Sequence, residues 1–204
     1  MDENNSIYGP YRLELEKIEK ELLDEIDTLR ERLKQKNGMD PVEHCLSRIK
    51  SEESMREKCV RKGLPVTTES ALTKIYDAVG IRVVCAFIDD IYRFRDHLIA
   101  LPGTEVIEEK DYIKHAKPNG YRSYHMILRM HQKFYAEIQL RTISQDTWAA
   151  LEHHIRYKHD IGKSNEELIA SELKRCADEL ASTDLSMQTI RDMIFEDNGK
   201  SETE

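Results

Sequence analysis

The chain has 204 residues and a formal net charge of −8 at pH 7, with 34% charged and 39% hydrophobic residues. This length indicates one domain with a sizeable core, and the negative charge argues against a general DNA- or membrane-binding surface, which needs a broad excess of Lys and Arg. The N-terminus is acidic and polar, and no window approaches the roughly 18 apolar residues of a membrane-spanning helix, so we expect a soluble, cytoplasmic protein.

The first third of the chain is predicted to be helical. Apolar residues at steps of three and four indicate a long helix over residues 11–36, which ends at Asn37-Gly38. Asp40-Pro41 combines a plausible N-cap with a proline suited to the first helical position, and it predicts a second helix toward residue 63. Residues 68–78 are again predicted to form a helix.

The central segment is predicted to form a sheet. The β-branched run over residues 79–87 indicates a buried strand, and a helix begins at Asp89-Asp90. Two later strands alternate around His131-Gln132 and are predicted to pair as a hairpin. The predicted strands are 79–87, 104–110, 121–130 and 133–140, and the last two helices are 144–159 and 164–195.

These elements predict an α+β fold with a mixed, largely antiparallel sheet of four to five strands, flanked by helices. Long helices are expected at both ends. The predicted divisions are an N-terminal helix (1–40), a central domain (41–160), a C-terminal helix (161–195) and a disordered tail (196–204). The four cysteines have no zinc-ligand spacing and indicate buried or half-buried free thiols in a reducing compartment.

A first polar cluster lies in "SRIKSEESMREKCVRKG", residues 47–63. On a continuous helix, the spacing of Lys50, Ser54, Lys58 and Arg61 would place three cations and a hydroxyl on one face. Such a face is typical of a solvated helix with i,i+4 ion pairs. It also suits a triphosphate, which lysines bind as point charges and arginine binds as a bidentate fork.

A second cluster lies in "DAVGIRVV". Asp77 precedes the predicted buried strand, Gly80 permits close backbone approach, and Arg82 lies within the strand. A charge in an apolar strand is costly unless a partner or a ligand compensates it. The pattern therefore indicates either an Asp–Arg salt bridge or a nucleotide site in which Asp77 binds Mg²⁺.

A third cluster lies in "EIQLRT", where strand alternation places Glu137, Gln139 and Arg141 on one face. This face is either merely solvated or the floor of a site for a polar ligand. The stretch "KDYIKHAKPNGYRSYH" is predicted to cover it. Its candidate residues are Lys114, Lys117 and Arg122 for charge, Tyr121 for stacking and His125 for a polar contact.

Together, "SRIKSEESMREK", "DAVGIRVVCAF", "KDYIKHAKPNGYRSYH" and "EIQLRTISQDTWAALEHHIRYK" resemble the synthetase domain of the RelA/SpoT superfamily. The resemblance covers residues 40–160, and with little else attached the chain resembles a stand-alone small alarmone synthetase. It implies a nucleotidyltransferase-like fold and transfer of the β,γ-pyrophosphate of ATP to the 3′-hydroxyl of GDP or GTP, which releases AMP.

The resemblance also implies residue roles. Arg48 and Arg82 would hold the adenine of ATP, and Asp77 and Glu137 would bind Mg²⁺, with Glu137 also taking the proton of the acceptor hydroxyl. The residues expected at the phosphates of ATP are Lys50, Ser54, Lys58 and Arg61. The residues expected around GDP or GTP are Lys114, Lys117, Tyr121 as the stacking residue, His125, Gln139 and Arg141.

Two other functional classes stay open from the sequence. One is a nucleotide- or RNA-binding module with weak or no catalysis, and the other is a related pyrophosphotransferase with another acceptor. The resemblance further implies a homo-oligomer, commonly a tetramer, and a role in the stringent response. A membrane partner is not expected, and neither is nucleic acid apart from a regulatory RNA.

Overall fold

The computed structural model describes residues 6–158 and 166–201, and these form five strands and several helices around one sheet. The strands are β1 (Val42–Ile49), β2 (Val79–Cys85), β3 (Thr104–Asp111), β4 (Tyr124–Met130) and β5 (Phe134–Thr142). The α-helices are α1 (Arg12–Asn37), α2 (Glu52–Arg61), α3 (Thr68–Thr73), α4 (Ile88–Ile99), α5 (Ile143–Lys158) and α6 (Glu166–Ser201).

The strand order in the sheet is β1-β2-β5-β4-β3. Only β2 and β5 run parallel, whereas the other three neighbouring pairs are antiparallel. The predicted mixed, largely antiparallel sheet is therefore confirmed. The parallel pair at its centre joins segments that are far apart in the sequence, and it brings the second and third polar clusters side by side.

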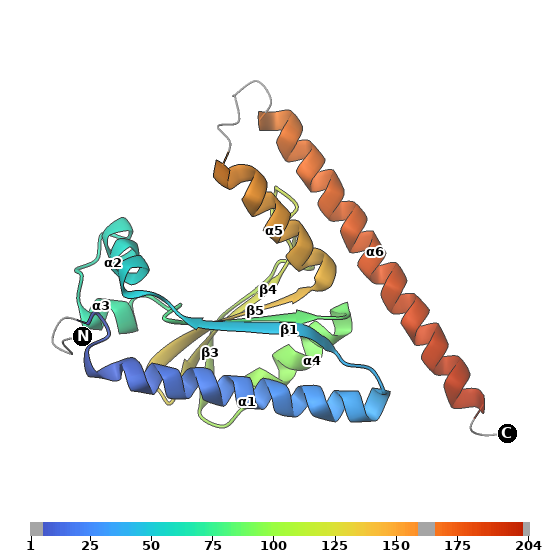
Figure 1. The fold of residues 1–204 in the computed structure, drawn as a ribbon, viewed down its shortest axis with the longest axis horizontal. Helices are drawn as coiled ribbons and strands as arrows, with labels where there is room; N and C mark the ends of the chain where they lie inside the picture. Colours follow the sequence, from blue (N-terminus) through green and yellow to red (C-terminus); the bar gives the residue numbers. More distant parts are fainter. Residues whose placement is uncertain (1–5, 159–165, 202–204) are drawn as a thin grey trace.

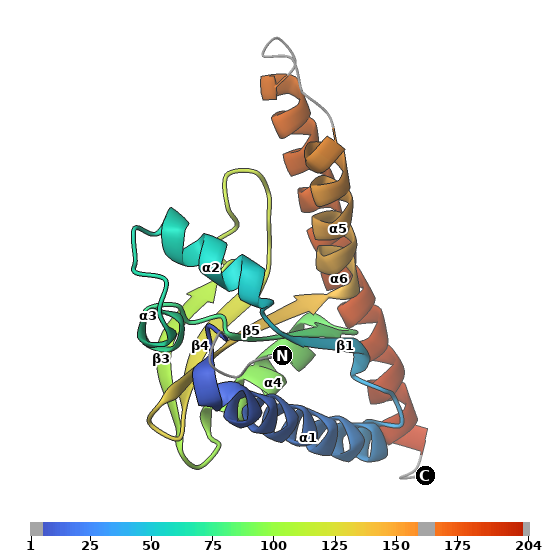
Figure 2. The same cartoon turned by 60° about the vertical axis from the view of Figure 1, so that its left-hand side comes forward.

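One face of the sheet is covered by α1 and α4, whereas α2 and α5 rise from the opposite face at its two ends (Figures 1 and 2). The core lies on the covered side, where α1 contributes Leu15, Ile18 and Leu22. Its apolar residues recur at steps of three and four, as predicted, and Gly38 ends the helix with a left-handed φ of 67°. The opposite face stays open between α2 and α5.

The helix predicted from Asp40-Pro41 toward residue 63 is wrong over its first part, which forms the edge strand β1, and is confirmed over α2. Asp40 does not cap a helix. Its carboxylate accepts hydrogen bonds from Arg30 and from the N–H of Val42. Strand β1 pairs with β2 along its length, and this ladder outweighs the local helix signal. Most side chains of β1 are exposed or half-buried, so its sequence lacks a strong strand pattern.

The last helix, α6, packs against α5 and α4 and reaches Ser201, beyond its predicted end at residue 195. The predicted disordered tail 196–204 is therefore wrong up to Ser201, and its remainder lies outside the described residues, as does the boundary at 160/161. Gly120 permits close approach of α6, because its φ is 92° and a Cβ there would lie 2.6 Å from the Cβ of Ala177.

All four cysteines are free, but Cys176 is exposed on α6, against the prediction that each would be at least half-buried. Among the residues placed by the structure, no helix has the length and apolar composition needed to cross a bilayer.

Candidate active site

The open face of the sheet carries most of the residues that the sequence singles out. Paired residues of neighbouring strands point to the same side, and every second residue of a strand shares that side. The parallel register places Gly80 beside Glu137 and Arg82 beside Gln139. From four strands, the candidates on this face are Arg48, Gly80, Arg82, His125, Glu137, Gln139 and Arg141.

A pocket of about 160 Å³ opens on this face where β1, β2 and β5 meet. Gly80 leaves its floor free of a side chain, and Arg48 and Arg82 reach it from neighbouring strands. The residues that line it are Leu46, Ser47, Arg48, Gly80, Ile81, Arg82, Glu137 and Gln139. The pocket is thus bounded by two guanidinium groups, a carboxylate and an amide, which suits a polar, anionic ligand.

Beside the pocket, Asp77 is held by two lysines. Its Oδ2 lies 3.1 Å from Nζ of Lys50 and 2.5 Å from Nζ of Lys58. Burial raises the pKa of Asp77, but the hydrogen bonds and charges of Lys58 and Lys50 outweigh burial and hold this pKa below its ordinary value. Asp77 is therefore ionised at neutral pH.

The predicted single helical face of cations is only partly correct. Because α2 begins at Glu52, Lys50 lies in the β1–α2 connection, where its N–H donates to the carbonyl of Ala78. Ser54 lies in the first turn of α2, and Arg61 is exposed at its last residue. Lys50 and Lys58 still meet, but through Asp77 and not through helical periodicity.

Two carboxylates of this region fit a magnesium ion. Oδ1 of Asp77 is buried and has no hydrogen-bond partner among the described residues, which leaves one hard oxygen unused. Glu137 is half-buried and lines the pocket. Its strand neighbour is Gly80, which follows Asp77 by three residues in the sequence. The donor set is therefore compatible with Mg²⁺, with phosphate oxygens and water completing the coordination.

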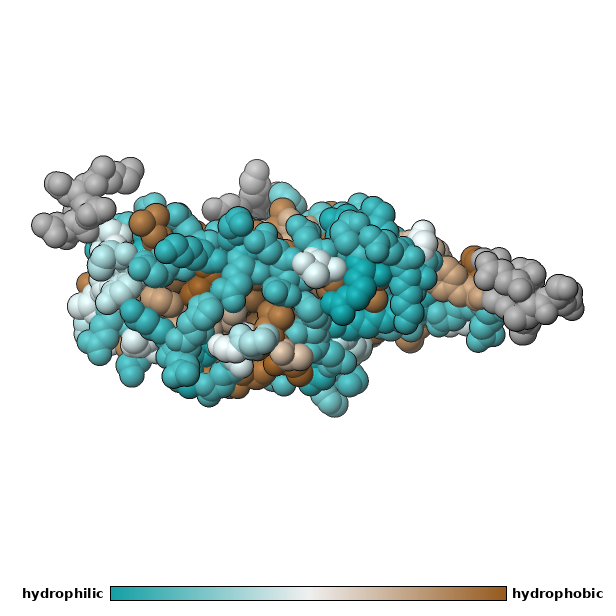
Figure 3. Space-filling model, turned by 90° about the horizontal axis from the view of Figure 1, so that it is seen from below, coloured by the Kyte–Doolittle hydropathy of each residue, from teal (hydrophilic) through white to brown (hydrophobic). Residues whose placement is uncertain are grey.

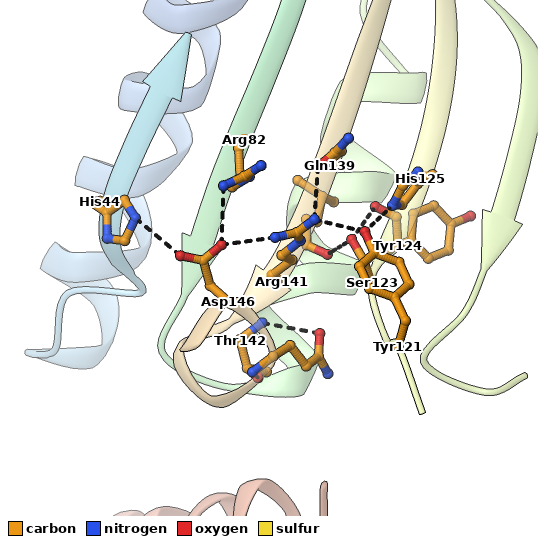
Figure 4. Close-up of polar contacts among 12 residues, drawn as sticks. His44, Arg82, Tyr121, Ser123, Tyr124, His125, Gln139, Arg141, Thr142 and Asp146 are labelled. Atoms are coloured by element: carbon orange, nitrogen blue, oxygen red, sulfur yellow. Dashed lines mark hydrogen bonds and ion pairs between the residues drawn. The ribbon is translucent and has the colours of Figure 1, made fainter. Parts of the chain in front are cut away.

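On the other side of the pocket, a hydrogen-bonded chain joins Arg141, Tyr121 and His125 (Figure 4). Nη2 of Arg141 donates to Oη of Tyr121 at 2.7 Å and to Oε1 of Gln139 at 3.1 Å. Oη of Tyr121 lies 2.8 Å from Nε2 of His125, whose Nδ1 is 3.9 Å from Oε1 of Glu137. The hydrogen-bonded chain therefore extends from Arg141 through the covering loop to His125, which lies near Glu137 without a hydrogen bond to it.

His125 is a neutral imidazole at physiological pH. Burial, followed by the charges of Arg141 and Lys117, lowers its pKa from 6.5 to about 4. A neutral ring can accept the Tyr121 proton at Nε2 and keep its own proton on Nδ1, the nitrogen that faces Glu137.

We expect His125 to make stability depend on pH. As pH falls from 6.5 toward about 4, the unfolded chain binds a proton at this residue and the folded protein does not. Above pH 6.5 His125 does not change the free energy of unfolding with pH. Near pH 4 it lowers this free energy by up to about 3 kcal/mol. Urea unfolding of wild type and His125→Asn across this range measures the difference. Parallel curves would contradict the buried, neutral state.

The loop that precedes β4 distributes its cations in different directions. Nζ of Lys117 lies 4.8 Å from the ring centroid of Tyr121, so these two candidate residues are in contact. Lys114 is exposed and lies beside Asp111. Arg122 does not face the site, against the prediction, because its Nη2 donates to Asp178 of α6 at 3.0 Å.

Asp146, in the first turn of α5, was not identified from the sequence. Its Oδ1 lies 3.0 Å from Nη1 of Arg141 and 3.4 Å from Nη1 of Arg82, and Oδ2 lies 3.8 Å from Nε2 of His44 (Figure 4). Arg82 therefore pairs with a carboxylate as well as lining the pocket, and that carboxylate is not Asp77. An acid in a first helical turn is so common that only the tertiary structure reveals this contact.

The fold and the site define an α+β protein with basic groups, carboxylates and an aromatic cluster on one sheet face, a set that suits a polar, anionic ligand. The family model described as "Region found in RelA / SpoT proteins" matches residues 47–162. GTP pyrophosphokinase YwaC of Bacillus subtilis (strain 168) is 38% identical over 87% of this chain and 89% of that protein. The chain belongs to the RelA/SpoT family.

Solved structures are similar over nearly the whole chain. The small alarmone synthetase 2 from Bacillus subtilis has a TM-score of 0.69 and 38% identity, and covers 86% of this chain and 96% of its own. The small alarmone synthetase 1 from Bacillus subtilis bound to its product pppGpp has a TM-score of 0.73 and 30% identity, and covers 92% of this chain and 95% of its own. The predicted family and fold class are thus confirmed.

Proposed function

We propose that this chain is a (p)ppGpp synthetase, which transfers the β,γ-pyrophosphate of ATP to the 3′-hydroxyl of GDP or GTP and releases AMP. The observation that carries the proposal is the common sheet face of Arg82, Glu137 and Gln139, beside the Lys50–Asp77–Lys58 cluster. Family membership and the names of the relatives, GTP pyrophosphokinases, support the same reaction.

The donor side of the site is assigned to the pocket and α2. Arg48 and Arg82 hold the adenine of ATP, because both guanidinium groups line the pocket and can lie against a ring. The triphosphate extends toward the ammonium groups at Asp77. Its proposed ligands are Lys50, Ser54, Lys58 and Arg61.

The acceptor side is assigned to the covering loop and β5. Tyr121 stacks on the guanine, and Glu137 takes the proton from the 3′-hydroxyl as this oxygen attacks the β-phosphorus of ATP. The bond from that phosphorus to the α-phosphate oxygen breaks, and AMP leaves. Further residues proposed to line the acceptor are Lys114, Lys117, His125, Gln139 and Arg141.

Mg²⁺ is the proposed cofactor, held by Asp77 and Glu137. When bound, it would neutralise charge that develops on the transferred pyrophosphate. Lys50 and Lys58 compete with the metal for Asp77, because both ammonium groups contact its Oδ2. Only Oδ1 is without a partner in the described part of the chain. Triphosphate is an alternative partner for both lysines, so nucleotide and metal are proposed to bind together.

A metal-binding measurement tests this arrangement. Without nucleotide, Lys58→Met is expected to bind Mn²⁺, a paramagnetic substitute for Mg²⁺, about fivefold more tightly than wild type, because one competing ion pair of about 1 kcal/mol is gone. Electron paramagnetic resonance measures free Mn²⁺ directly. Lys62→Met, an exposed position at the end of α2, is the control. The same Mn²⁺ affinity in all three proteins would refute the competition.

We also propose that the chain forms a homotetramer through the outer flank of α6. Cys176, Met187, Ile190 and Ile194 are exposed and follow steps compatible with a heptad seam, which a second copy of the helix can cover. Apolar surface is visible near the C-terminal end of α6 in Figure 3 (right), whereas most of that face is hydrophilic.

Light scattering is expected to show a tetramer for wild type and a smaller species for Ile190→Glu. Thr189→Glu, on the opposite flank, should leave the size unchanged.

The proposed setting is the cytoplasm and the stringent response. ATP and GDP or GTP are the proposed partners. The negative net charge of −8 argues against a general nucleic-acid partner, and a regulatory RNA is the one exception that the family resemblance leaves open.

An acceptor panel tests the proposed function. The purified protein is incubated with Mg²⁺, γ-labelled ATP and, separately, GMP, GDP, GTP, ADP or tRNA, and the labelled products are identified. Label on GDP or GTP is expected. Label on ADP or tRNA alone would favour another pyrophosphotransferase, and binding without transfer would favour a binding module.

A further inference from the structure

Asp146 connects the two halves of the proposed site. It lies on α5, and its Oδ1 contacts Arg82 of β2 and Arg141 of β5 (Figure 4). Its side chain is only 17% exposed. The two arginines lie on different sides of the site. Arg82 lines the pocket assigned to ATP, and Arg141 donates hydrogen bonds to Tyr121 and Gln139 on the acceptor side.

The two guanidinium groups need a shared counter-charge. Arg141 is buried, with 7% of its side chain exposed, and Arg82 lies near enough for their like charges to repel. Nε of each arginine is buried without a hydrogen-bond partner in the part of the chain that the structure describes. The orientation of the buried Arg141 therefore depends strongly on the carboxylate of Asp146, and that of the more exposed Arg82 depends on it less.

The contacts of Asp146 are unequal. The distance to Arg141 is 3.0 Å, whereas the distance to Arg82 is 3.4 Å, at the long end of a hydrogen bond. Arg82 is also the more exposed partner, at 38%. A nucleotide that engages Arg82 can therefore draw it away from Asp146 at little cost. The carboxylate then serves Arg141 alone, which in turn fixes Oη of Tyr121.

We propose that Asp146 is a positioning residue that couples the donor and acceptor subsites, so that occupancy of the ATP pocket orders Arg141 and Tyr121 for the guanine nucleotide. The inference rests on the proposed function. By reciprocity, the guanine nucleotide must tighten binding of ATP by the same factor. Asp146 does this without touching either substrate.

Calorimetry tests the coupling without turnover. The Kd of GDP is measured with and without a saturating ATP analogue that carries a methylene bridge between its α- and β-phosphates. Wild type is expected to bind GDP roughly 5- to 150-fold more tightly when the analogue is present. In Asp146→Asn the factor should fall to less than about twofold, and Asp146→Glu, which keeps the charge, should restore part of it.

The matched control is Asp89→Asn. Asp89 also pairs with a buried arginine, Arg191 of α6, at 2.8 and 2.9 Å, but outside the pocket. This variant should melt at a lower temperature and keep the wild-type coupling factor. A purely structural role of Asp146 would lower the melting temperature in the same way without changing the factor.

Three results would overturn the inference. The first is a wild type whose Kd for GDP does not change with the ATP analogue, a result that needs no folded variant. The second is an Asp146→Asn protein with the same coupling factor as wild type. If wild type transfers pyrophosphate to GDP and either of these two results is obtained, the inference fails alone. If wild type binds neither nucleotide, the proposed function fails and the inference fails with it.

Discussion

Glu137→Gln is expected to lower kcat about 10²- to 10⁴-fold, because an amide cannot accept the proton of the acceptor hydroxyl and is a weaker metal ligand than a carboxylate. The substitution preserves size on β5, where Glu137 is half-buried and lines the pocket. The melting temperature should therefore change little. Steady-state kinetics with ATP and GDP, together with thermal unfolding, measure both quantities.

Glu105→Gln is the matched control for this substitution. Glu105 lies on β3, pairs with Arg129 and does not line the pocket, so kcat should stay within a factor of a few of wild type. A Glu137→Gln protein that is folded and turns over nearly as fast as wild type would remove Glu137 from the proposed catalytic role.

Tyr121→Ala is expected to lower kcat/KM for GDP or GTP roughly 5- to 150-fold, the equivalent of losing a base stacking contact of about 1–3 kcal/mol. The Kd of ATP, measured without a guanine nucleotide, should change far less, because ATP is assigned to the other side of the site. Tyr121→Phe keeps the stacking ring and should lose much less activity than Tyr121→Ala, with any loss limited to the ordering that Arg141 provides through the hydroxyl. It should lower the melting temperature, since Arg141 and His125 each lose a hydrogen-bond partner.

Tyr11→Ala is a suitable control, because this tyrosine also lies under an ammonium group, that of Lys133 at 4.1 Å, but packs against Phe134. It should leave the ratio of the two substrate constants unchanged. Equal losses for ATP and GDP in Tyr121→Ala would mean that Tyr121 supports the loop as a whole. A large loss of activity in Tyr121→Phe would assign the effect to the hydroxyl.

Strand periodicity predicted much of this site. Glu137, Gln139 and Arg141 alternate with apolar residues, so their common face follows from the two-residue repeat of a strand. Arg82 was predicted on another ground, because a charge inside the apolar strand β2 is costly unless a partner or a ligand compensates it. The sequence could not predict that β2 and β5 are parallel neighbours, because this pairing depends on the packing of segments about fifty residues apart.

Other features depend on tertiary contacts that leave no local pattern. The β1 segment was predicted to be helical, because its proline and acidic residue outweigh its weak alternation. Lys50 and Lys58 were expected to meet along a helix, yet they meet at Asp77. The roles of Arg122 and Asp146 also depend on tertiary contacts. Arg122 bonds to Asp178 of α6 and so points away from the site, whereas α5 places Asp146 beside Arg141.

The stoichiometry of the reaction tests the central claim most directly. Wild-type protein is incubated with ATP, GDP and Mg²⁺, and the nucleotides are separated and identified by mass spectrometry. We predict AMP and a guanosine product with two added phosphoryl groups in equal amounts, with Glu137→Gln forming neither at a comparable rate. Formation of ADP in place of AMP, or consumption of ATP without modification of GDP, would contradict pyrophosphate transfer.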